Sequence, residues 1–162
     1  MKDIYSPIYN LVEKELYLDA LKALLSDGLE KINPPFDQDL NHAWYLVGDI
    51  FYQLRRYVDS IIAFKKALDE WDADVDAILA LSNAYSSNRE PRNAEDVLRR
   101  GLEIDPDNEK FRYNLGNSLF DQKRFDEAIE YYRGIKLNNM LAKMARSNIR
   151  KSKEAKQKNS TK

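Results

Sequence analysis

Three aspartates at alternate positions form the chain's best candidate for a metal site. The stretch DADVDA spaces Asp72, Asp74 and Asp76 like the first carboxylates of a calcium-binding loop. Such a loop needs glycine at its sixth position and a bidentate glutamate at its twelfth, and these positions hold Ala77 and Asn83. The spacing therefore favours a structural role, in which one aspartate caps the helix that follows. We expect no bound metal.

The single histidine, His42, is the other residue that could support catalysis. With no cysteine and no second histidine in the chain, we expect neither a catalytic triad nor a zinc site around it. The phosphate-binding patterns GxxxxGK[ST] and GxGxxG are also missing. The sequence therefore predicts a protein that is not an enzyme and needs no cofactor, with His42 solvated or lining a groove.

A repeat of 34 residues organises the middle of the chain. YLVGDIFYQLRRYVDSIIAF at 45–64 returns as YNLGNSLFDQKRFDEAIEYY at 113–132, and the two matching glycines are Gly48 and Gly116. A third small residue, Ser82, lies midway. Each copy has helical periodicity with one break, which predicts two short helices per unit. The units are 41–74, 75–108 and 109–142.

These units resemble the tetratricopeptide repeat family, in which small residues let two helices cross closely and large residues fill the space around the crossing. Arg112 and Ile135 depart from the pattern. The resemblance implies an all-α fold, a right-handed superhelical solenoid of antiparallel helix pairs. The small positions are Gly48, Ser60, Ser82, Ala94, Gly116 and Ala128, and the large ones are Trp44, Val47, Phe51, Phe64, Ile78, Leu81, Tyr85, Leu98, Leu115, Leu119 and Tyr132.

The two ends of the chain are less regular than its middle. Residues 1–40 are predicted to form a helical hairpin and a linker. The hairpin is either a degenerate repeat over 2–35, with Gly28 in a small packing position, or unrelated to the repeats. Residues 143–162 are predicted to form a basic capping helix whose tail frays from about residue 152. The apolar stripe expected to cover the last repeat is Met140, Leu141, Met144, Ala145 and either Ile149 or Asn148.

The resemblance also indicates where a partner would bind, because the first helices of successive tetratricopeptide units line a concave groove. Exposed aromatic rings there favour binding, and amide side chains suit a peptide backbone. The alternative is that Tyr45 and Tyr113 only cover neighbouring helices. The predicted partner-binding residues are Tyr45, Asp49, Tyr52, Leu79, Asn83, Lys110, Tyr113, Asn117 and Phe120.

Some tetratricopeptide domains clamp the C-terminal carboxylate of chaperones with lysine, asparagine and arginine side chains. Asn83 and Asn114 match the two asparagines of that motif. Leu79, Met144 and Asn148 replace its charged residues, so we do not expect chaperone tails to bind. The function predicted instead is a non-enzymatic interaction module, an adaptor, assembly factor or chaperone, that holds a peptide or helix of a partner protein.

Charge suggests a second function. The 162 residues carry a net charge of −1, but the segment from Lys143 onward carries +7 and the preceding residues −8. The basic tail could contact nucleic acid or an anionic membrane. A third alternative is a self-associating scaffold, and we expect a monomer or a weak homodimer. No signal peptide or transmembrane segment is evident, and the chain is expected in the cytoplasm.

Overall fold

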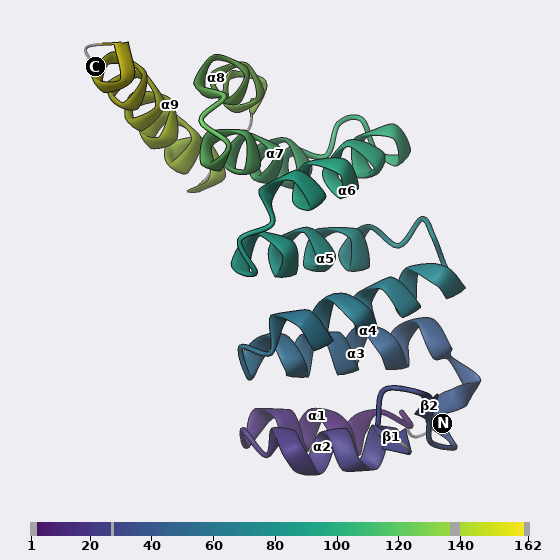
Figure 1. The fold of residues 1–162 in the computed structure, drawn as a ribbon. Helices are drawn as coiled ribbons and strands as arrows, with labels where there is room; N and C mark the ends of the chain where they lie inside the picture. Colours follow the sequence, from purple (N-terminus) through teal and green to yellow (C-terminus); the bar gives the residue numbers. More distant parts are fainter. Residues whose placement is uncertain (1–2, 27, 137–139, 161–162) are drawn as a thin grey trace. The chain divides into compact units, whose positions relative to one another are not determined.

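The computed structural model describes residues 3–26, 28–136 and 140–160, and it divides into two compact units, Met1–Ala84 and Tyr85–Lys162. Both units are built from helices, which confirms the predicted all-α fold (Figure 1). The first unit contains α1 (Ser6–Glu13), α2 (Tyr17–Leu24), β1 (Leu25–Ser26), β2 (Lys31–Ile32), the 3₁₀ turn η1 (Phe36–Gln38), α3 (Leu40–Gln53), α4 (Tyr57–Glu70) and most of α5 (Val75–Ser87). The second contains the end of α5, then α6 (Pro91–Ile104), α7 (Glu109–Asp121), α8 (Phe125–Arg133) and α9 (Met140–Ser160).

The α3–α4 pair shows why the repeat needs small residues. A Cβ atom added to Gly48 would lie 2.6 Å from the ring of Phe64, so only glycine lets the ring pack against α3. From α4, the buried Ser60 hydroxyl donates a hydrogen bond of 2.9 Å to the carbonyl of Gly48. Gly116 and Tyr132 repeat this contact between α7 and α8, where an added Cβ would lie 2.5 Å from the ring. The predicted packing role of both glycines is confirmed.

Each pair turns through the same backbone conformation. Glu15, Arg55, Arg89 and Lys123 have φ between 57° and 63°, the left-handed conformation that ends a helix. After Arg55, the N–H of Arg56 donates to the carbonyl of Phe51 at 2.9 Å, which closes the turn. The same bond follows each of the other three residues. The α1–α2 hairpin therefore shares its turn with the repeats.

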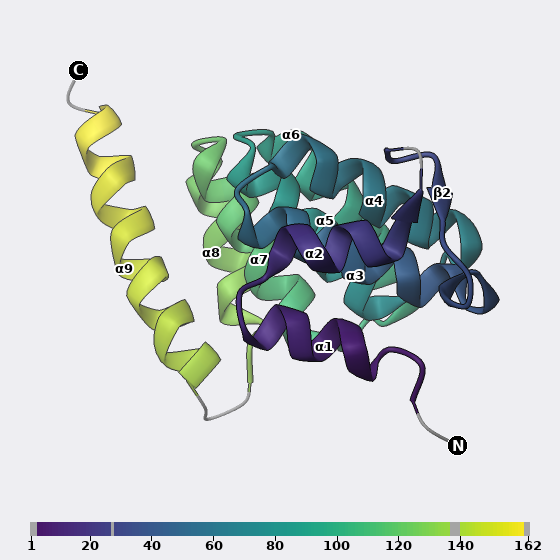
Figure 2. The ribbon, with the colours of Figure 1, turned by 90° about the horizontal axis from the view of Figure 1, so that it is seen from below.

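The segment after α2 differs from the sequence prediction. The helix ends at Leu24, and β1 and β2 form a small antiparallel hairpin with Leu25 opposite Ile32, next to α3 (Figure 2). Gly28 has φ of 69° and no atom within 4 Å of an added Cβ. Gly28 therefore does not take the helix-packing position that a degenerate repeat over 2–35 would give it: it serves the turn, where a left-handed conformation is needed.

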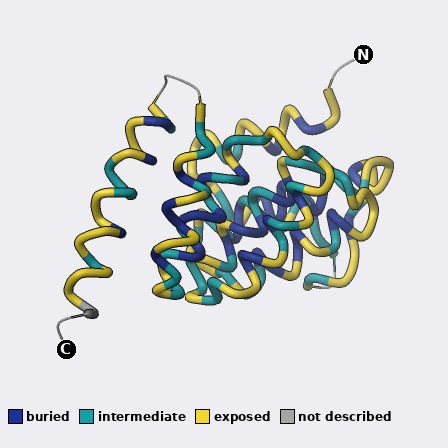
Figure 3. Tube along the Cα trace, turned by 90° about the horizontal axis from the view of Figure 1, so that it is seen from above, coloured by how far each residue is buried: buried dark blue, intermediate teal, exposed yellow. Residues whose placement is uncertain are grey.

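The C-terminal helix also differs in two respects. α9 continues to Ser160 instead of fraying at residue 152, since Ser152 is fully buried and Lys156 Nζ lies 2.7 Å from the Asp126 carboxylate. The predicted stripe is right only in part: Ala145 is buried and Leu141 and Asn148 are half-buried, whereas Met140 and Met144 are 72% and 43% exposed. The buried positions, which recur along the helix in Figure 3, are Ala142, Ala145 and Ser152. Small residues allow α9 to approach α8 closely.

Among the described residues, no helix combines the length and the apolar character that crossing a lipid bilayer requires.

Candidate functional site

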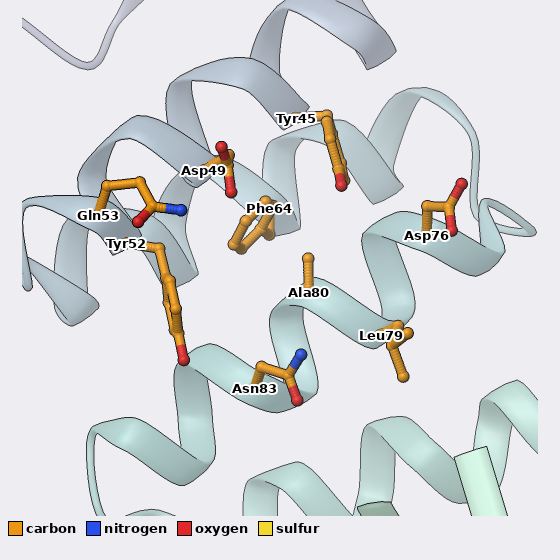
Figure 4. A pocket seen from close by; sticks show the side chains of 9 residues that line it. All are labelled: Tyr45, Asp49, Tyr52, Gln53, Phe64, Asp76, Leu79, Ala80 and Asn83. Atoms are coloured by element: carbon orange, nitrogen blue, oxygen red, sulfur yellow. The ribbon is translucent and has the colours of Figure 1, made fainter. Parts of the chain in front are cut away.

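A hollow of about 200 Å³ lies between α3 and α5 of the first unit. We call it the α3–α5 hollow. Figure 4 shows Tyr45 and Tyr52 projecting from α3 with Asp49 between them. The buried side chain of Phe64, from α4, lies between Asp49 and Ala80 in the same view. Its lining residues are Tyr45, Asp49, Tyr52, Gln53, Phe64, Asp76, Leu79, Ala80 and Asn83.

Helical spacing puts three α3 side chains on one face. Tyr45, Asp49 and Tyr52 follow one another at intervals of four and three residues, which share a side of a helix. The Tyr45 ring packs 5.7 Å from the ring of Phe64, centroid to centroid. The Tyr52 ring packs 5.5 Å from that of Tyr57 on α4. Both tyrosines are half-buried, so each keeps an edge accessible to a ligand.

The start of α5 is fixed by Asp74. Its Oδ1 accepts hydrogen bonds of 3.0 Å from the backbone N–H groups of Asp76 and Ala77. Its Oδ2 accepts one of 3.0 Å from the Asn41 side chain, which also donates to the carbonyl of Ala67 at the end of α4. The predicted capping aspartate is thereby identified. The cap orients α5 so that Asp76, Leu79 and Asn83 line the hollow.

The lining of the hollow is negatively charged, because it contains Asp49 and Asp76 and no lysine or arginine. Burial raises the pKa of the Asp49 carboxyl above its usual value, and a hydrogen bond with Gln53 opposes this only in part. Burial also raises the pKa of Tyr45, with further contributions from the negative charges of Asp49 and Asp76. An ionised carboxylate held in a partly dry aromatic site attracts a cation more strongly than one in water does.

The structure brings together five of the nine predicted binding residues: Tyr45, Asp49, Tyr52, Leu79 and Asn83. Gln53 and Asp76 complete the hollow from the same helix faces, at groove positions of the repeat. Phe64 could be predicted only as a packing residue, yet its edge reaches the hollow. Ala80 carried no signal, because a small residue in a helix can serve either a core or a binding surface.

The other four predicted residues lie in the second unit, and the side chains of Tyr113, Asn117 and Phe120 are engaged within it. Tyr113 is only 9% exposed, and its hydroxyl accepts a hydrogen bond of 3.2 Å from Asn148 of α9. The Asn117 Oδ1 accepts from Asn148 at 3.0 Å and from Tyr132 at 2.8 Å. This corrects the expectation that the Tyr113 ring is presented to a partner, since α9 covers it.

Phe120 and Lys110 complete that group. The ring of Phe120 packs edge-on against Phe125, with 5.3 Å between centroids. Lys110 is exposed near the start of α7, and its backbone N–H donates to the capping Asn108.

His42 has a structural role beside the hollow. Its Nε2 lies 2.7 Å from the hydroxyl of Tyr9, and its ring packs edge-on against Tyr5 at 4.5 Å. Tyr5 in turn donates to the carbonyls of Phe36 and Asp39. The cluster joins α1 to the start of α3. Within the described ranges, no group of three or more His, Cys, Asp or Glu side chains could hold a metal ion.

Comparison with known proteins identifies relatives for this arrangement. A family profile described as tetratricopeptide repeat matches residues 11–75 and 79–138. The type IV pilus assembly protein PilF of Pseudomonas aeruginosa is 32% identical over 69 residues. That alignment covers 43% of this chain and 27% of PilF, so the chain spans about a quarter of that relative's length.

Solved structures show the same fold at low sequence identity. MamA has a TM-score of 0.74 at 19% identity, with 94% of this chain and 80% of MamA covered. A tetratricopeptide repeat protein from Parabacteroides merdae also has a TM-score of 0.74, at 15% identity, over 93% of this chain and 59% of that one. The first tetratricopeptide domain of Spaghetti (RPAP3), bound to the HSP90 peptide SRMEEVD, has a TM-score of 0.66 at 18% identity, over 73% and 93%. These comparisons indicate no catalytic family and support a role in protein–protein interaction.

Proposed function

Because the chain belongs to the tetratricopeptide repeat family, we propose that it is a non-enzymatic interaction protein that docks a peptide or helix of a partner protein in the α3–α5 hollow. The observation that carries the proposal is the pair of half-buried tyrosines, Tyr45 and Tyr52, on either side of a recessed polar group. Core packing alone does not require two accessible aromatic rings at this surface.

The lining residues have the chemistry of a peptide site. Leu79 and the tyrosine rings supply apolar contact area at little cost in conformational entropy. Asn83 is exposed, and its amide can donate to and accept from the backbone of a docked segment. Gln53 and Tyr52 add hydrogen-bonding groups at the same end of the hollow. This mixture suits a segment that presents both side chains and backbone groups.

Residues of this chain argue against one partner class that a structural neighbour binds. The RPAP3 domain is described with an acidic HSP90 peptide, SRMEEVD. Here Leu79 occupies the place of a lysine in the chaperone-binding motif, and Asp49 would repel an acidic peptide. We therefore propose a partner other than a chaperone tail. We also propose that the protein serves as an adaptor, assembly factor or chaperone in the cytoplasm. A contact of the basic α9 with nucleic acid or anionic membranes is a separate proposal.

Selection of peptides from a random display library tests the proposal directly. We expect peptides that bind the wild-type chain and lose at least about tenfold in affinity for Tyr52→Ala or Leu79→Ala, because truncation removes apolar contacts of the hollow. Val58→Ala, an exposed apolar truncation on α4, is the matched control and should leave binding unchanged. Circular dichroism verifies that each variant is folded. Binders that are indifferent to both hollow variants would refute the proposal.

A further inference from the structure

We infer that the α3–α5 hollow accepts a positively charged side chain, lysine or arginine, from the partner segment. The inference rests on the proposed function and narrows it to one partner chemistry. It is carried by the lining of the hollow, in which carboxylates and aromatic rings face the same space.

Among the described residues, no basic side chain pairs with the two carboxylates of the hollow. Asp49 lies at the middle of the α3 side, and Asp76 lies in the first turn of α5. Within the part of the chain that the structure describes, neither forms an ion pair, and no lysine or arginine is among the lining residues. The Asp49 side chain forms a hydrogen bond with Gln53, which is neutral. A lysine or arginine of the partner segment would therefore meet a carboxylate whose negative charge no residue of the fold neutralises.

Contrast with Glu95 in the second unit shows what a structural carboxylate looks like in this protein. Glu95 is buried, and its oxygens accept from Arg99 at 2.7 Å, Arg124 at 2.6 Å and Gln122 at 2.7 Å. Its charge is neutralised inside the fold. Asp49 has no such arrangement, although desolvating it costs free energy. The presence of a partly buried carboxylate without a basic partner is better explained by ligand binding than by a contribution to stability.

The walls of the hollow suit the stem and the charge of a long basic side chain. Tyr45 and Tyr52 present half-buried aromatic rings, which attract an ammonium or guanidinium group placed over their faces and pack against its methylene groups. The hollow of about 200 Å³ is many times the space that one water molecule needs, so it can admit the end of such a side chain.

The charge of the whole unit acts in the same direction. Residues 1–84 contain fifteen Asp or Glu and eight Lys or Arg, a net charge of −7. A negative field of this size attracts basic segments over distances comparable to the Debye length and disfavours acidic ones. Local lining and overall charge therefore select the same class of partner.

The test uses peptides selected against the full chain. In each peptide that needs Tyr52 and Leu79, each lysine is replaced in turn by norleucine and each arginine in turn by citrulline, which remove the charge and keep most or all of the side-chain length. Affinities for wild type, Asp49→Asn and Asp69→Asn are measured by fluorescence anisotropy. Asp69, an exposed carboxylate on α4 outside the hollow, matches the charge change at Asp49.

We expect neutralising one peptide position to weaken binding to wild type and to Asp69→Asn by about tenfold, and to have much less effect on Asp49→Asn. Such coupling assigns the cation to Asp49. Equal losses in all three proteins, or hollow-dependent peptides that need no basic residue, would overturn the inference and leave the proposed function intact. If no selected peptide depends on Tyr52 or Leu79, the proposed function fails as well.

Discussion

At the scale of single residues, the pKa values of two partly or fully buried carboxyl groups are shifted in opposite directions. Burial raises the pKa of Asp49, and the single hydrogen bond with Gln53 does not compensate. Burial also opposes the ionisation of Glu95, but hydrogen bonds from Gln122, Arg99 and Arg124 outweigh it, and its pKa is lowered. Ionised Asp49 therefore reduces stability, whereas ionised Glu95 contributes to it.

Asp49→Asn should stabilise the protein at neutral pH. The raised pKa means that the folded state binds more protons than the unfolded state just above the usual Asp range, so the unfolding free energy falls as pH rises through that window. Asparagine removes this penalty and retains an acceptor for Gln53. We expect a gain of about 0.5–2 kcal/mol at pH 7, shrinking as the pH is lowered toward 4. Urea unfolding at both pH values measures it, and a loss at pH 7 would contradict the account.

Glu95→Gln should have the opposite pH dependence. The lowered pKa gives Glu95 a stabilising contribution that is complete above its usual range and lost as pH falls through the folded-state pKa. We expect a loss of about 1–2 kcal/mol at pH 7, because Arg99 and Arg124 stay partly exposed and regain water. Glu127→Gln, the control at an exposed partner of Arg124, should lose less. A loss that does not diminish in acid would refute the assignment.

Gly48→Ala tests the close approach of α3 and α4. The added methyl group would lie 2.6 Å from the Phe64 ring, an overpacking that costs about 1–3 kcal/mol and exceeds the ~1 kcal/mol that alanine gains as a helix former. Chemical denaturation should show net destabilisation. In a Phe64→Leu background the smaller side chain leaves room, and the same change should cost less. Equal costs in both backgrounds would show that the ring is not the obstacle.

At the scale of elements, the sequence located the helices better than it identified the faces that they bury. The spacing of 34 residues located the helix pairs, because the small residues at the helix crossings recur at that interval in the sequence. α9 was predicted as a helix from its apolar residues, but Met140 and Met144 face solvent. The size of its side chains determines the face that packs, because the small residues Ala142, Ala145 and Ser152 allow close contact. A hydropathy pattern carries no information about side-chain size. Likewise, Gly28 could not reveal from its type whether it served a packed helix or a turn.

The α9 cap should depend on Asn148 more than on its exposed charges. Asn148 donates to the hydroxyl of Tyr113 and to Asn117, and alanine would leave both acceptors without that donor. We expect Asn148→Ala to cost about 1–2 kcal/mol. Lys156→Ala removes an exposed pair with Asp126 and should cost less than about 1 kcal/mol. Hydrogen exchange of the α7 and α8 amides reports the loss, and the reverse order of effects would contradict the packing described.

At the scale of the whole molecule, charge is divided between the two units. Residues 1–84 carry −7 within a total of −1, so residues 85–162 carry +6. This division was visible in the sequence, as was the set of groove positions. The hollow was not, because a pocket requires the tertiary placement of Phe64 and Ala80 beside α3 and α5. Nor could the sequence show that α9 covers Tyr113.

Binding of basic peptides should weaken with salt. Raising the ionic strength from about 0.05 to 0.5 M shortens the Debye length severalfold and screens the field of the acidic unit. We expect the association rate to fall more than the dissociation rate rises, because screening acts mainly on the encounter. Stopped-flow fluorescence separates the two rates. Affinity that is independent of salt would contradict electrostatic attraction.

The most direct test of the central claim is a map of amide chemical shifts in the full, ¹⁵N-labelled chain titrated with a selected lysine-containing peptide. The account predicts that the largest saturable changes fall on residues 45–53 and 76–83, and that Asp49→Asn reduces them while Asp69→Asn does not. Changes centred on α6 or α9, or a map unaltered by Asp49→Asn, would contradict it.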